Sequence, residues 1–160
     1  MIKSVLPEIP IFENLDREQI EELSTWLHRK DISRGATIIH QDDSSDGLFV
    51  LAKGEVEVLK QNGSGELVIA ELEAPSVIGE MGLLNAAKRS AAVRAKTDVV
   101  VGLLPAALFM EKLKEVNVTA LLIGVNLGRI ACQRLRVTTD RLAALSDACT
   151  RHADHGVEIS

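Results

Sequence analysis

The sequence lacks an apolar stretch long enough to cross a membrane. Its longest apolar run, residues 99–110, is interrupted by Pro105 and is far shorter than the ~20 residues of a spanning helix. The first ten residues contain a lysine, a glutamate and two prolines, but not the apolar core of a secretory signal. We therefore expect a soluble, cytoplasmic protein without a membrane partner.

Cysteine and positive charge are also scarce. The two cysteines, Cys132 and Cys149, form no Cys-x-x-Cys pair, which fits a reducing compartment better than a disulfide framework. The net charge of −5 makes the chain a poor candidate for direct binding to nucleic acid, whose non-specific affinity comes from neutralised phosphates. The 160 residues predict one domain with a core that needs neither disulfides nor metal.

The residues of an enzyme site are missing too. A cupin-like metal enzyme needs several histidines and a carboxylate inside a β-barrel, and the region predicted to form strands offers only His40. No nucleophile, base and orienting residue stand out as a set. Cys149, His152 and His155 have ligand-like spacing, but a polar terminus offers no fourth ligand and no groups to orient them. We expect neither enzyme activity nor a metal.

The first part of the chain, residues 4–30, has a helical pattern. Asn14, Leu15 and Asp16 are candidate caps, and apolar residues then recur at near-helical spacing as far as Leu27. From residue 31 the pattern changes to short strands separated by glycine. Strands are predicted near residues 37–39, 48–51, 55–58, 66–73, 91–97 and 99–104, with a hairpin turn at residues 62–65. This spacing favours a β-sandwich or small barrel.

After Pro105 ends the last strand, residues 117–145 predict one long helix, with Thr119 as a candidate cap. One side of it carries residues at the alternating spacing of 3 and 4 that is typical of a coiled-coil seam. A second apolar side gives the helix more apolar surface than one small β-domain can cover. We therefore predict a homodimer through this helix, with core packing inside one chain as the alternative. The residues of the seam are Leu121, Val125, Gly128, Cys132, Leu135, Thr139 and Leu142.

Residues 77–95 have the chemistry of a phosphate site. If residues 81–85 form a single helical turn after Gly79, the first backbone N–H groups of the turn are available to an anion. Arg89 adds a permanent charge that can make two hydrogen bonds to a phosphate. Glu80 would repel an anion, so a sugar hydroxyl is its natural partner. The pattern predicts a site for phosphate plus ribose, and the alternative is a surface arginine and glutamate beside an ordinary turn.

At these positions the sequence resembles the phosphate cassette of the cyclic-nucleotide-binding domains. That cassette has Gly-Glu, a small apolar turn, then Arg-(Ser/Thr/Ala)-Ala and a β-branched residue. The chain departs from it at Pro75-Ser76, where Gly-Asp is frequent, and at Lys88, where proline is frequent. The resemblance is greatest to the catabolite activator branch and covers most of residues 8–145. The matching residues are Gly79-Glu80-Met81-Gly82-Leu83-Leu84 and Arg89-Ser90-Ala91-Ala92-Val93.

The resemblance implies an α+β, mainly β fold: an eight-stranded β-roll, or jelly roll, with N-terminal helices and a long C-terminal helix. The implied domain is 1–147, with helices in 8–30, the β-roll in 31–104, the cassette in 78–93, the long helix in 117–145, and a flexible tail in 148–160. The resemblance assigns the ribose 2′-hydroxyl to Glu80. It assigns the cyclic phosphate to Arg89, assisted by Ser90 and Ala91, and to the turn at Gly79, Met81, Gly82 and Leu83.

The long helix supplies the other implied contacts. In the catabolite activator branch a segment similar to residues 134–140 places a Thr-Ser pair against adenine, and its arginine pairs with the cassette glutamate. The resemblance therefore implies that Thr138 and Thr139 contact the base and that Arg134 pairs with Glu80. The alternative for mid-helix threonines is a hydrogen bond back to the preceding turn.

The function implied by the resemblance is a cyclic AMP sensor, with cyclic GMP possible as ligand, that signals through its C-terminal helix to an unknown protein. Relatives of the activator type carry a helix-turn-helix reader after the long helix. The 15 residues that follow Leu145 are too few for such a reader. We expect either a stand-alone sensor or the sensory fragment of a longer transcription regulator, without direct contact to nucleic acid.

Overall fold

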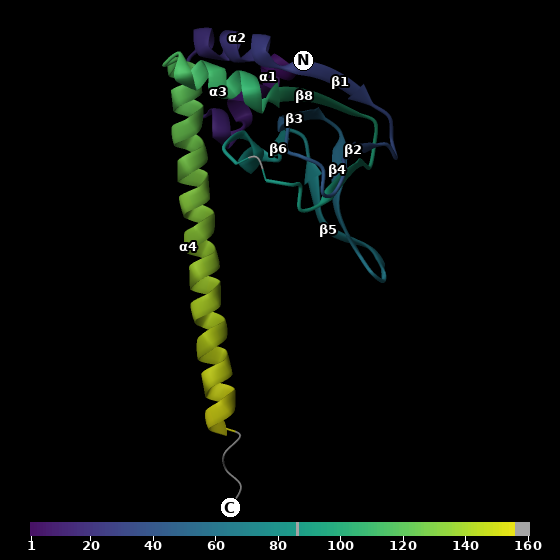
Figure 1. The fold of residues 1–160 in the computed structure, drawn as a ribbon, viewed down its shortest axis with the longest axis vertical. Coiled ribbons are helices and arrows are strands. Elements are labelled where there is room, and N and C mark those ends of the chain that lie inside the picture. The colour runs from purple at the N-terminus through teal and green to yellow at the C-terminus, as the bar shows by residue number, and fades with distance from the viewer. Residues whose placement is uncertain (86, 156–160) are drawn as a thin grey trace, which may run out of the picture. The chain divides into compact units, whose positions relative to one another are not determined.

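Two four-stranded antiparallel sheets form the body of the protein in the computed structural model, which describes residues 1–85 and 87–155 (Figure 1). The order of the first sheet is β1-β8-β3-β6, and that of the second is β2-β7-β4-β5. The predicted eight-stranded β-roll is confirmed. The strands are β1 His28–Ile32, β2 Thr37–Ile39, β3 Gly47–Lys53, β4 Glu55–Asn62, β5 Gly65–Glu73, β6 Ser76–Ile78, β7 Ala92–Ala95 and β8 Val99–Pro105.

The core of the β-roll is formed by side chains from both sheets, because alternate residues of a strand point to the same face. Strand β3 is buried at every position except Lys53. It lies between β8 and β6, and helical segments pack against it as well, so both of its faces are covered. The buried core residues are Ile39, Phe49, Leu51, Val56, Ile78, Val93, Ala95, Val99 and Val101.

The N-terminal segment contains α1 Ile2–Val5, the 3-10 turns η1 Leu6–Glu8 and η2 Pro10–Phe12, and α2 Arg17–Trp26. Asp16 caps α2 as predicted: its carboxylate accepts from the Gln19 amide, and the Gln19 side chain accepts from the Asp16 amide, both at 2.8 Å. The helical prediction is wrong at residues 28–30, which belong to β1. This strand is polar and largely exposed, so backbone pairing with β8 defines it rather than any side-chain pattern.

Strand β8 ends at Pro105 and leads into α3 Ala106–Lys114, followed by α4 Val118–His155. Asn117, rather than the predicted Thr119, caps α4: its side-chain oxygen accepts from the Ala120 amide at 3.0 Å, while Thr119 is buried. Helix α4 continues past the predicted end at Leu145, because no proline or glycine follows to stop it before His155. Residues 148–155, predicted as part of a flexible tail, are therefore helical, and residues 156–160 lie outside the described part.

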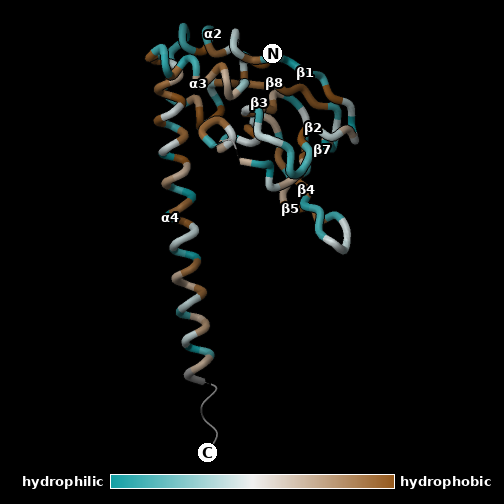
Figure 2. Tube along the Cα trace, in the orientation of Figure 1, coloured by the Kyte–Doolittle hydropathy of each residue, from teal (hydrophilic) through white to brown (hydrophobic). Residues whose placement is uncertain are grey.

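The chain divides into two compact units inside α4, Met1–Asn126 and Leu127–Ser160, and the domain bounds 1–147 stay a prediction. Apolar and polar residues alternate along the whole helix (Figure 2). The large seam residues are exposed in both units. Within the described residues no single helix is long and apolar enough to span a membrane, and only the bent pair α3 and α4 taken together meets that test of length and composition.

Candidate functional site

The predicted phosphate-binding turn lies between β6 and β7. Gly79 has φ 73° and ψ 33°, a left-handed conformation that glycine adopts at little cost. It begins the 3-10 turn η3 Glu80–Leu83, so the predicted single helical turn forms one residue earlier than expected. Leu83 is buried and anchors the turn on the core, whereas Met81 is 46% exposed. Ala86, within the predicted cassette, lies outside the described residues.

The guanidinium of Arg89 packs directly against this turn and is only 9% exposed. A Cβ added to Gly79 would collide with Nη1 of Arg89, and one added to Gly82 would lie 3.3 Å from the same atom. Glycine is therefore required at position 79 for its positive φ and for the close approach of a charged group. At position 82 the φ is not positive, and the main close approach is that of the Ser45 side chain rather than of Arg89.

The hydrogen bonds of Arg89 are accepted by groups at the end of the loop between β2 and β3, at the first residue of β3 and in the turn. Nη2 donates to the Gly47 carbonyl at 2.6 Å, while its contact with Asp46 Oδ1 and the contact of Nη1 with the Gly79 carbonyl are each 3.5 Å long. A guanidinium has five N–H donors in a rigid fork. One short bond and two long ones therefore hold it in place and leave it able to bind an anion through two hydrogen bonds.

Sequence reasoning missed the contribution of this loop. Nothing in the local sequence pattern distinguishes Asp46-Gly47 from an ordinary turn. The loop is joined to the cassette by two backbone bonds of 2.8 Å, from the Asp42 amide to the Arg89 carbonyl and from the Arg89 amide to the Asp43 carbonyl. Ser45 adds a buried hydroxyl for which the described residues offer no hydrogen-bond partner, and a Cβ on Gly82 would collide with it.

Glu80 is buried as well, at 8% exposure. Arginine and glutamate are seldom buried in proteins without a reason, because removing a charge from water is costly. Two such side chains in one short segment are unusual for a structural turn. Arg89 and Glu80 are therefore not surface residues, and the arrangement is suited to a ligand with one negative group and one hydroxyl.

The remaining predicted site residues fall into two groups. Ser90 is exposed and Ala91 half-buried, and both lie between Arg89 and the start of β7. Arg134, Thr138 and Thr139 are exposed on the second unit. There the Thr138 hydroxyl donates to the Arg134 carbonyl and the Thr139 hydroxyl to the Leu135 carbonyl, both at 2.9 Å. A hydroxyl that donates in this way can still accept, so the base contact stays a prediction.

Strand β7, which follows the cassette, is tied to the β4–β5 hairpin by charge. Arg94 donates from Nε to Glu57 at 2.9 Å and from Nη1 to Glu66 at 3.2 Å. The hydrogen bond to Glu57 raises the pKa of Arg94 above its usual value. The neighbouring Lys96 likewise has a raised pKa, chiefly through its hydrogen bond to Glu71. These pairs hold the C-terminal end of the cassette in register with the second sheet.

We expect Gly79→Ala to lower the free energy of unfolding by about 1–3 kcal/mol, because alanine is strained at this φ and its methyl group meets Arg89. Gly63→Ala is the matched control, since a Cβ there has nothing within 4 Å. Urea denaturation of the two variants and the wild type measures the difference. Equal midpoints for Gly79→Ala and Gly63→Ala would show that the left-handed turn is not required.

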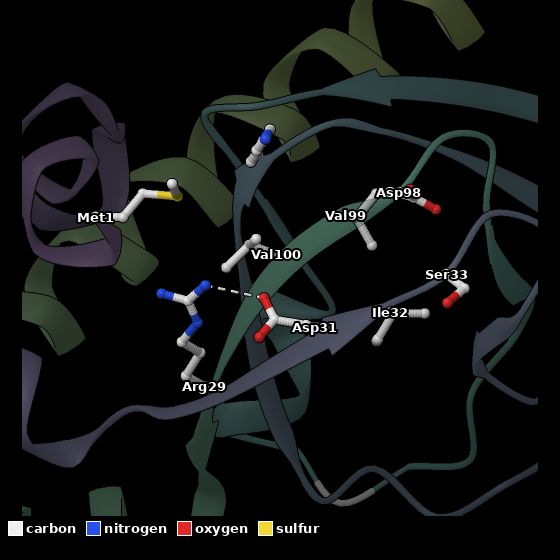
Figure 3. A pocket seen from close by; sticks show the side chains of 9 residues that line it. Met1, Arg29, Asp31, Ile32, Ser33, Asp98, Val99 and Val100 are labelled. Carbon is white, nitrogen blue, oxygen red and sulfur yellow. Dashed lines mark hydrogen bonds and ion pairs between the residues drawn. The ribbon is translucent and has the colours of Figure 1, made fainter.

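A hollow of about 360 Å³ lies along β1 and β8, away from the cassette (Figure 3). Its charged groups are largely occupied within the protein: Arg29 pairs with Asp31 at 3.0 Å, and Asp98 accepts from the Arg34 amide at 2.8 Å. The rest of its lining is mostly small or apolar. The residues along it are Met1, Arg29, Asp31, Ile32, Ser33, Lys53, Asp98, Val99 and Val100.

In the described part of the chain, no three His, Cys, Asp or Glu residues come together as a group that could hold a metal ion. Cys149 is exposed on α4, as is His152, while the side chain of His155 lies outside the described part.

Comparison with known proteins identifies residues 29–116 as a match to the family described as cyclic nucleotide-binding domain. A cAMP-dependent protein kinase regulatory subunit of Mycosarcoma maydis is 33% identical over 95 residues, which cover 59% of this chain but only 18% of that protein. The structure of the N-terminal domain of a transcriptional regulator from Streptomyces coelicolor A3(2) has a TM-score of 0.74 and 30% identity, covering 86% of this chain and 94% of that one. The Thermus thermophilus catabolite activator protein has a TM-score of 0.75 and 27% identity, covering 86% and 63%.

Proposed function

Because the chain belongs to the cyclic-nucleotide-binding domain family, we propose that it is a cyclic AMP sensor that signals through α4. The observation that carries the proposal is the buried Arg89 guanidinium, which packs against two glycines. Among the described residues it is held by one short hydrogen bond and two long contacts. An arginine held in this way is prepared for a phosphate, which can replace the two long contacts with charge-assisted hydrogen bonds. The buried Glu80 is the corresponding group for a ribose hydroxyl.

The proposed ligand contacts come from the cassette and from α4. In the cassette, Arg89 and Ser90 bind the cyclic phosphate together with the turn from Gly79 to Leu83, and Glu80 accepts from the ribose 2′-hydroxyl. On α4, Thr138 and Thr139 contact the base, and Arg134 pairs with Glu80. A ligand shifts the balance between two states of a protein only when it binds one of them more tightly, which is the physical requirement for a signal.

Calorimetric titration with cyclic AMP and cyclic GMP tests the proposal, with 5′-AMP as the control that keeps the base but opens the phosphate ring. We expect one cyclic nucleotide per chain and much weaker binding of 5′-AMP, whose additional charge and geometry do not suit the cassette. The absence of binding heat with both cyclic nucleotides, confirmed by an unchanged melting temperature, would overturn the function.

We expect cyclic AMP to bind more tightly than cyclic GMP, and Thr138→Ala to reduce that preference. The reason is that a hydroxyl can accept a hydrogen bond from the exocyclic amino group of adenine. Thr150→Ala is a matched control, because the Thr150 hydroxyl makes the same kind of bond to the carbonyl of Ser146, at 3.0 Å. Equal affinities for the two nucleotides, unchanged in Thr138→Ala, would contradict this prediction.

We further propose that the protein is a cytoplasmic homodimer and a binding module rather than an enzyme. The exposed seam of α4 supports the dimer, and the two free cysteines fit a reducing compartment. The matched part of the chain spans less than a fifth of the length of the Mycosarcoma maydis relative, so the proposal takes no downstream partner from that protein. The alternative is the sensory part of a transcription regulator, favoured by the extensive match to the N-terminal domain from Streptomyces coelicolor.

A further inference from the structure

Both cysteines lie on the seam of α4. Beyond Leu142 the alternating spacing of 3 and 4 continues through Ser146 to Cys149, so Cys132 and Cys149 occupy positions of the same repeat. Both thiols are free and exposed. In a two-stranded coiled coil such positions face the other helix. The sequence therefore has its only two thiols on the surface that the proposed homodimer would bury.

The two cysteines cannot pair within one chain. They are 17 residues apart on one helix, which at 1.5 Å per residue separates them by about 25 Å. A disulfide requires Cα atoms about 4.4–6.8 Å apart. Any disulfide that either cysteine forms must therefore join it to another molecule.

The charges beside the seam favour a parallel pair of helices. The basic residues next to the seam are Arg129 and Arg136, and in a parallel, in-register pair they face Gly124 and Ala131 of the other copy. An antiparallel pair that buries the whole seam from Leu121 to Cys149 is centred at Leu135. It brings Arg136 of one copy against Arg136 of the other, which is repulsive. In the parallel pair each cysteine faces the same cysteine of the second copy.

We propose that Cys132 and Cys149 are redox modification sites that link two copies of this chain covalently, with glutathione disulfide as a suitable oxidant. The inference rests on the homodimer in the proposed function. One thiolate attacks the small disulfide and releases one glutathione thiol. The matching thiolate of the second copy then displaces the other glutathione, so that one protein disulfide forms, the protein thiols lose two protons, and two electrons pass to the oxidant. The bond locks the helices in register, so the dimer persists on dilution.

Non-reducing electrophoresis of the full chain after incubation with glutathione disulfide tests the site. We expect most of the wild type to form a covalent dimer, Cys132→Ser and Cys149→Ser each to form one through the remaining cysteine, and the double variant to form none. Peptide mapping by mass spectrometry should find only Cys132–Cys132 and Cys149–Cys149 pairs. A Cys132–Cys149 pair, a ladder of higher oligomers, or the absence of cross-linking would overturn the proposal.

Light scattering and nucleotide titration under reducing conditions show whether a failure to cross-link also contradicts the proposed function. A reduced dimer that binds nucleotide but does not cross-link as expected contradicts only the parallel, disulfide-forming arrangement. A reduced monomer contradicts the homodimer itself. In the oxidised wild type, dilution to nanomolar concentration should leave the dimer intact, whereas the oxidised double variant should dissociate as the reduced wild type does.

Discussion

Arg89→Ala is expected to weaken cyclic nucleotide binding by about 2–5 kcal/mol, the cost of truncating one partner of a desolvated charge pair, or roughly 30- to 5,000-fold. The side chain is buried, and its guanidinium lies against Gly79 and Gly82. Calorimetry with cyclic AMP measures the loss. Lys88→Ala is the matched control, because Lys88 is the adjacent residue and is exposed.

The same variant also removes the hydrogen bond to the Gly47 carbonyl, so its fold has to be checked by circular dichroism. Arg89→Lys provides the second measurement: lysine keeps the charge but loses the two-pronged geometry. We expect it to bind with an affinity between those of the wild type and the alanine variant. Wild-type affinity in either folded variant would show that the cassette does not hold the phosphate.

Leu135→Glu is expected to dissociate the homodimer. Leu135 is 68% exposed on the seam, and in a dimer the substitution would bury one carboxylate from each copy in the same layer. An uncompensated buried charge costs about 3–5 kcal/mol, which corresponds to a dissociation constant higher by about 150- to 5,000-fold. Light scattering across a concentration series measures the change.

Val137→Glu is the matched control for this experiment. Val137 is also an exposed apolar residue of α4, at 44%, but it lies off the seam. We expect it to leave the dimer intact. Leu135→Glu should also change the affinity for cyclic nucleotide. The reason is that contacts from Thr138 and Thr139 to the base would couple ligand binding to the position of α4. A monomeric wild type, or a Leu135→Glu variant that stays dimeric, would contradict the seam.

Sequence patterns predicted turns, helix caps and strand ends well where a few neighbouring residues determine them. The Asn62–Gly65 turn does join β4 to β5, Asp16 does cap α2, and Pro105 does separate the last strand from a helix. The strands β1 and β6 were missed. They are short or polar, and each exists because it pairs with a buried strand, β8 or β3, that is distant in the sequence.

At the end of α4 the prediction failed for a different reason. The polar composition after residue 147 suggested a tail, but the backbone continues as a helix to His155. Polar residues without proline or glycine do not end a helix, since its hydrogen bonds are made by the backbone and its exposed side chains can remain in water. The apolar pattern therefore predicted where burial of side chains ends, and it did not predict where the helix ends.

The sequence alone determined which groups are available to bind a ligand. Gly79, Glu80, Arg89 and Ser90 lie within one short segment, so their order can be recognised without the fold. The tertiary structure decided the environment of those groups. Arg89 is held in its buried position by a hydrogen bond to the carbonyl of Gly47, 42 residues earlier. The buried Ser45 hydroxyl, from the same loop, is brought beside Gly82 of the turn. Contacts of this kind depend on how distant strands pair, and no local periodicity records that pairing.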